Sequence, residues 1–118
     1  IIGMGETWED RLAIAKLLKN LGVSSVPINV LIPIKNTPFE KIPSIPAIDV
    51  IKTIALFRII LEDKTIKIAA GREHLGPFEA LAFLAGANGM IVGGYLTIKG
   101  RSAKEDQRFI EGIKAIVC

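Results

Sequence analysis

The sequence predicts an α/β fold built on a parallel sheet. Its 118 residues alternate short apolar runs, rich in Val and Ile, with longer segments whose apolar residues recur at helical spacing. Such runs suit strands buried on both faces, and βα alternation produces parallel strands joined by right-handed crossovers. Four βα units in 118 residues are about half of a closed eight-stranded barrel, which has ~250 residues. We therefore expect a single domain, residues 1–118, that is either half of a TIM-type (βα)8 barrel or a small open α/β sheet.

The expected elements follow one another in strict alternation. Ile1–Met4 has the pattern of a strand end, and Thr7 is the expected N-cap of the first helix, with Asp10 as the acid of a capping box. Gly22 is expected to end that helix, and Pro77 to open the third helix at its first turn. The later strands are expected at residues 26–34, 65–69 and 89–93, and the later helices at 47–62, 77–87 and 103–117, with a proline-rich loop at 36–47.

Composition excludes several classes of protein. The net charge is +3, the basic residues are scattered, and the aromatic residues are one Trp, one Tyr and five Phe, which argues against nucleic-acid binding. No apolar stretch approaches the roughly 20 residues of a membrane-spanning helix, and no secretion signal opens the chain. The one cysteine, Cys118, builds no disulfide framework. We expect a reducing, cytoplasmic setting.

Polar and glycine-rich clusters follow the expected strands, whereas the strand starts carry nothing comparable. In α/β folds, ligands bind at the carboxyl ends of the strands, so this asymmetry indicates a site there. The clusters are Gly3, Gly5 and Glu6; Asn29 with Lys35–Thr37; Gly71–His74; and Gly93–Tyr95.

Asn29 is the most informative single residue, because every neighbour in VPINVLIPI is apolar or proline. A buried carboxamide without partners costs about 1–3 kcal/mol. Asn29 therefore either bonds a backbone group freed by Pro27 or Pro33, or faces a ligand. An amide offers both a donor and an acceptor, which suits a urea or amide ring.

Three other candidates remain open on the residues alone. Glu6 either meets the positive end of the following helix dipole or accepts a hydrogen bond from an amine or a ribose hydroxyl. Lys67 lies opposite Ile66 and Ile68 in strand alternation, and points either into a barrel or out between helices. His74 is the only histidine, so a metal site is not expected, and no residue pattern supports hydrolysis within this chain.

Five ordered blocks resemble the C-terminal part of the biotin synthase family along nearly the whole chain. Several blocks at the right separations are far more specific than any one of them. The blocks are IIGMGETWEDRL at 1–12, SVPINVLIPIKNTP at 25–38, IKTIALFR at 51–58, IKIAAGRE at 66–73 and AFLAGANGMIVGGYLT at 82–97.

This resemblance implies part of a radical S-adenosylmethionine enzyme with a (βα)8 barrel, here from the fifth-strand end to the eighth helix. In that family a [4Fe–4S] cluster on a CxxxCxxC loop cleaves S-adenosylmethionine, and the resulting radical prepares dethiobiotin for sulfur insertion from an auxiliary cluster. No CxxxCxxC occurs here, so the resemblance implies that the cluster-binding half is missing and that this chain alone is inactive. It also implies a homodimer for the full-length enzyme.

The resemblance assigns roles to individual positions. Asn29 matches the asparagine that bonds dethiobiotin, and Ile1, Gly3 and Glu6 match a segment that packs against the adenosine. Ile32 matches a residue of the adenine pocket.

Lys67 departs from the family pattern, because it stands where the family carries an arginine that ligates the auxiliary [2Fe–2S] cluster. A protonated lysine is a poor iron ligand, so the cluster type is open, and Cys118 is a conceivable ligand of an unusual one. Two alternatives also stay open: a related enzyme resembling the hydrogenase maturase or methylornithine synthase, and a non-catalytic α/β module that binds a small ligand.

Overall fold

The computed structural model describes residues 1–94 and 99–117. Three parallel strands form one sheet in the order β1 (Ser25–Ile28), β2 (Thr65–Ile68) and β3 (Gly89–Met90). Four α-helices accompany them: α1 (Trp8–Asn20), α2 (Ala47–Leu61), α3 (Glu79–Leu84) and α4 (Ala103–Val117), with a 3-10 segment η1 (Arg72–Phe78) before α3. The predicted α/β class and the parallel strands are confirmed.

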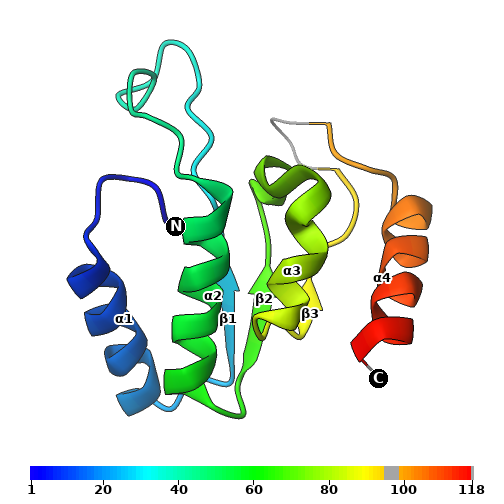
Figure 1. The fold of residues 1–118 in the computed structure, drawn as a ribbon. Coiled ribbons are helices and arrows are strands. Elements are labelled where there is room, and N and C mark those ends of the chain that lie inside the picture. Colours follow the sequence, from blue (N-terminus) through cyan, green and yellow to red (C-terminus); the bar gives the residue numbers. More distant parts are fainter. Residues whose placement is uncertain (95–98, 118) are drawn as a thin grey trace.

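Strand alternation divides the sheet into a covered face and an open face. Val26 and Ile28 of β1 and Ile66 and Ile68 of β2 are buried in one cluster with apolar residues of the helices. The residues that alternate with them along the two strands are exposed or half-buried, namely Ser25, Pro27, Thr65 and Lys67. Figure 1 shows α2 in front of β1 and α3 in front of β3, so the helices cover one side of the sheet.

Local chemistry explains where the helices begin and end. The predicted capping box is confirmed: Thr7 Oγ1 accepts from the Asp10 N–H at 3.1 Å, and Asp10 Oδ2 accepts from the Thr7 N–H at 2.8 Å. The predicted ranges of the second and fourth helices hold within one residue. The end of α2 is fixed by Arg58, whose Nη1 donates to the carbonyls of Glu62 and Lys64.

Three predicted boundaries are wrong. The strand expected at 26–34 ends at Ile28, and beyond it an isolated bridge pairs Val30 with Ile2, which places residues 1–4 beside β1. The helix expected at 77–87 is shorter than predicted: its first two residues form the 3-10 turn that follows the non-helical Gly76 (φ 50°, ψ −128°), and α3 ends at Leu84. The strand expected at 89–93 has only the two residues of β3.

Candidate functional site

Three segments meet at the carboxyl end of the sheet. The Ile2 N–H donates to the Asn29 carbonyl at 2.8 Å, and the Leu31 N–H donates back to the Ile2 carbonyl at 2.9 Å. On the other side of β1, the Val30 N–H donates to the Ala70 carbonyl at 2.8 Å. The structure therefore brings the N-terminal segment, the end of β1 and the end of β2 together, as the polar clusters predicted.

Asn29 is half-buried at this edge, and its side chain already makes one bond. Its Oδ1 accepts from the Ala70 N–H at 3.2 Å, so the partner lies past the end of β2 and is not a group freed by Pro27 or Pro33. Because that partner is a donor, the oxygen must face it. Among the described residues Nδ2 has no acceptor, so Asn29 presents a donor to any ligand.

Glu6 is fixed by its own chain. Its carboxylate accepts from the N–H groups of Gly3 and Met4 at 2.8–3.1 Å and pairs with Arg11, whose Nη2 lies 2.7 Å from Oε1. Partial burial raises the pKa of Glu6, but the hydrogen bonds from Gly3, Arg11 and Met4 outweigh it, and the pKa lies below its ordinary value. Arg11 also donates to Thr53 Oγ1 of α2 at 3.1 Å. The carboxylate thus holds the Gly3–Gly5 turn against α1 and α2.

The other residues predicted for the cofactor lie close by along the chain. Ile1 is 70% exposed, and Ile32, two residues beyond the bridge, is half-buried. Gly3 has φ +90°, and a Cβ there would lie 3.2 Å from the Ile45 side chain in the proline-rich segment. His74 Nε2 bonds the Ile45 carbonyl at 2.5 Å. The proline-rich segment is therefore attached both to the N-terminal turn and to η1.

Lys67 lies on the open face of the sheet, level with Pro27 of β1 and Gly89 of β3. A Cβ at Gly89 would lie 2.9 Å from Lys67 Cγ, so the glycine makes room for the lysine stem across β3. Lys67 is half-buried. The described residues contain no group of three or more His, Cys, Asp or Glu side chains that could hold a metal ion. Tyr95 and Cys118 lie outside the described residues.

A buried ion-pair ring was missed at the sequence level. We define the charge ring as Arg72, Glu79, Arg101 and Asp106, in which each arginine bonds both carboxylates at 2.6–3.0 Å. Asp106 also accepts from the Gly93 N–H at 2.7 Å. The ring ties η1, α3 and α4 to Gly93, three residues beyond the end of β3. A signal was available: Asp106 lies three, four and seven residues before Phe109, Ile110 and Ile113, on the apolar face of its helix.

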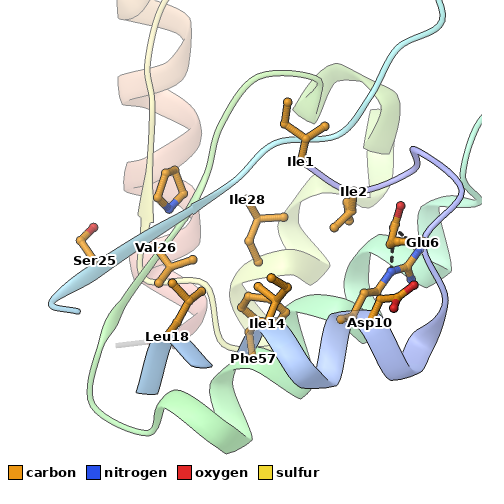
Figure 2. A pocket seen from close by; sticks show the side chains of 12 residues that line it. Ile1, Ile2, Glu6, Asp10, Ile14, Leu18, Ser25, Val26, Ile28 and Phe57 are labelled. Atoms are coloured by element: carbon orange, nitrogen blue, oxygen red, sulfur yellow. Dashed lines mark hydrogen bonds and ion pairs between the residues drawn. The ribbon is translucent and has the colours of Figure 1, made fainter. Parts of the chain in front are cut away.

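A groove of about 360 Å³ runs beside β1 rather than at the strand ends. Figure 2 shows side chains of α1 on one side of it and side chains of β1 on the other, with the Glu6–Arg11 pair at one end. Ile14 and Ile1 are at least half exposed here, although both are apolar. The residues that form its apolar walls are Ile1, Ile14, Leu18, Val26, Ile28 and Phe57.

No helix among the described residues is long and apolar enough to cross a membrane.

Comparison with known proteins agrees with the motifs. The chain is 64% identical to the biotin synthase of Thermotoga neapolitana and 59% identical to that of Thermotoga petrophila, in each case over 99% of this chain. It is 47% identical over 94% of its length to the biotin synthase of Thermodesulfovibrio yellowstonii. The chain spans only 35–42% of the length of these three relatives. The resemblance to biotin synthase inferred from the sequence blocks is confirmed.

A family match covers most of the chain. The sequence model of the Biotin and Thiamin Synthesis associated domain matches residues 27–114, from β1 to the last turn of α4. That range includes Asn29, Ile32, Lys67 and the whole charge ring. The chain belongs to the Biotin and Thiamin Synthesis associated domain family.

Proposed function

We propose that this chain is part of a biotin-synthase-like radical S-adenosylmethionine enzyme that inserts sulfur into dethiobiotin. The observation that carries the proposal is Asn29, which sits at the carboxyl end of β1 with its amide oxygen used and its amide nitrogen available. A urea carbonyl is an acceptor, so the ureido oxygen of dethiobiotin is a suitable partner for that N–H. The biotin synthase relatives support the reaction class.

The fold proposed for the parent enzyme is a (βα)8 barrel, of which this chain supplies the part from the fifth-strand end to the eighth helix. Two features support it. The face of the sheet away from the helices is open, as the inward face of a barrel strand is before the barrel closes. Ile2 already pairs with Val30 in parallel orientation. If the parent chain continues this pairing before Ile1 as a strand parallel to β1, that strand would run along the groove. Its alternate side chains would then lie opposite Ile28 and Val26.

The cofactor proposed for the parent is S-adenosylmethionine, with Ile1, Gly3, Glu6 and Ile32 beside the adenosine. The geometry fits a supporting role for Glu6, because its carboxylate shapes the glycine turn instead of standing free. Gly3 and Ile1 would then offer backbone and apolar surface, and Ile32 apolar contact. The S-adenosylmethionine would supply the radical, and these residues would orient its adenosine.

The iron–sulfur clusters of the proposed enzyme find no ligand set among the described residues. We propose that the ligands of the [4Fe–4S] cluster lie outside this chain, which makes the isolated chain inactive, and that the full-length enzyme is a homodimer. Lys67 does not fit the role of an auxiliary-cluster ligand while protonated. This lysine favours a second candidate, a related radical enzyme resembling the hydrogenase maturase or methylornithine synthase.

Replacing Asn29 in the full-length parent tests the substrate contact. Asn29→Asp keeps an oxygen for the Ala70 N–H but replaces the amide donor with a carboxylate, which repels a carbonyl oxygen. We expect the KM for dethiobiotin to rise roughly 10- to 100-fold, which corresponds to about 1.4–2.7 kcal/mol. Steady-state assays of biotin formation measure it.

Asn88→Ala is the matched control. The Asn88 Oδ1 also bonds a strand backbone, accepting from the Ile66 N–H at 2.8 Å, but at the opposite end of the sheet. This variant is expected to lose stability without a change in KM. If the Asn29→Asp enzyme has the wild-type KM for dethiobiotin, Asn29 does not contact the substrate.

A further inference from the structure

Glu73 is a carboxylate that its surroundings leave unpaired. Both of its side-chain oxygens are buried, and neither has a hydrogen-bond partner among residues 1–94 and 99–117. The residue lies in η1, five residues beyond Ile68 at the end of β2 and next to Arg72 of the charge ring. A Cβ at Gly100 would lie 2.8 Å from Glu73 Oε1, so the carboxyl group lies close to the backbone of Gly100.

The neighbouring arginines do not compensate Glu73. The charge ring contains two guanidinium groups and two carboxylates, Glu79 and Asp106, and each guanidinium bonds both carboxylates. The ring is therefore electrically closed, with no net charge to offset a further carboxylate. His74, the next residue along the chain, directs Nε2 to the Ile45 carbonyl. Within the part of the chain that the structure describes, the Glu73 carboxyl therefore has no hydrogen-bonded or ion-paired cation.

Burying an unpaired carboxylate is costly, and buried charges in proteins are normally paired or coordinate metals. A metal ion would need further ligands, and the described residues offer no group of three. We propose that Glu73 is the binding group for an organic monocation, an ammonium or a guanidinium, that reaches the end of β2 in the complete enzyme. Two sources share this chemistry: a cationic small molecule, and a lysine or arginine from the rest of the parent chain.

The position supports a cation at the ligand end. Gly71, two residues before Glu73, is pressed against the Val30 carbonyl, which directly follows Asn29. Glu73 is therefore tied through a short stretch of backbone to the edge where Asn29 presents its donor. A ligand at that edge would meet a donor on β1 and a carboxylate past β2.

The test uses Glu73→Gln in the full-length parent, with Glu111→Gln as the control that removes an exposed acidic charge from α4. Thermal melting is measured without ligand, and binding of S-adenosylmethionine, which is cationic, and of dethiobiotin, which is not, is measured by calorimetry. A melting temperature lowered by several degrees relative to the control identifies a side-chain cation.

An unchanged melting temperature with S-adenosylmethionine affinity reduced about tenfold or more, and dethiobiotin affinity unchanged, identifies a small-molecule cation. A melting temperature that stays equal or rises, together with unchanged S-adenosylmethionine affinity, overturns the proposal, because Glu73 would then have no cationic partner. The interpretation of the binding calorimetry rests on the proposed function, whereas the interpretation of the melting temperatures does not. Loss of the proposed function therefore leaves the melting result interpretable.

Discussion

Replacing Asp106 with alanine is expected to destabilise the protein by about 3–5 kcal/mol, because it leaves two arginines, one of them fully buried, to share the single carboxylate of Glu79. Arg72 is 2% exposed and Asp106 is 0% exposed, so water cannot replace the lost bonds. The same substitution also removes the acceptor of the Gly93 N–H, three residues beyond β3. Urea unfolding of the full-length parent, compared with Glu111→Ala on the exposed side of α4, measures the effect. A loss below about 1 kcal/mol would mean that the ring contributes little.

The contribution of Asp106 should depend on pH in a defined direction. Burial raises its pKa, but hydrogen bonds from Gly93, Arg101 and Arg72 outweigh it, and the pKa lies below the ordinary value of 3.8. A carboxyl group with a lowered folded-state pKa stabilises the fold above its ordinary pKa and loses that contribution as pH falls through the folded value. The difference in unfolding free energy between wild type and Asp106→Ala is therefore largest near neutral pH and becomes smaller below about pH 4.

The second large effect is expected at Gly71. Its φ is +82°, and a Cβ there would lie 2.0 Å from the Val30 carbonyl oxygen. An alanine meets both the left-handed backbone cost of about 1–2 kcal/mol and a clash with backbone that cannot rotate away. We expect Gly71→Ala to cost about 3 kcal/mol or more and to separate β1 from the end of β2.

Gly22→Ala is the matched control for this substitution. Gly22 also has a positive φ, +68°, but a Cβ there would meet nothing within 4 Å. Gly22→Ala should cost only the left-handed backbone strain, about 1–2 kcal/mol. Equal melting temperatures for the two variants would show that the close approach at Val30 does not constrain the sheet.

Local rules predicted those parts of the fold that depend on neighbouring residues. The Thr7–Asp10 capping box and the range of α4 follow from interactions within a few residues, and both were predictable. The break at Gly76 was not, because Pro77 reads as a helix start regardless of the conformation that precedes it. The short β1 reflects pairing with Ile2, far away in sequence.

The candidate site was predictable in position but not in detail. The clusters after the strands were expected to converge at one edge because parallel strands end together, and the segments around Ile2, Asn29 and Ala70 do converge there. The partners of Glu6 and Asn29 depend on the path of the backbone: Gly3 and Met4 fold back on Glu6, and Ala70 belongs to another strand. The charge ring joins residues up to 34 positions apart, and only the acid on the apolar face of α4 indicated it.

The most direct test of the proposed function is turnover by the full-length parent, reconstituted anaerobically with iron and sulfide. It is supplied with S-adenosylmethionine, a reductant and dethiobiotin, and mass spectrometry quantifies 5′-deoxyadenosine and biotin. The account predicts both products, with biotin formed only when dethiobiotin is present. Cleavage of S-adenosylmethionine without formation of biotin would mean that the parent is a radical enzyme with a substrate other than dethiobiotin. No cleavage by a fully loaded enzyme would contradict the proposed function altogether.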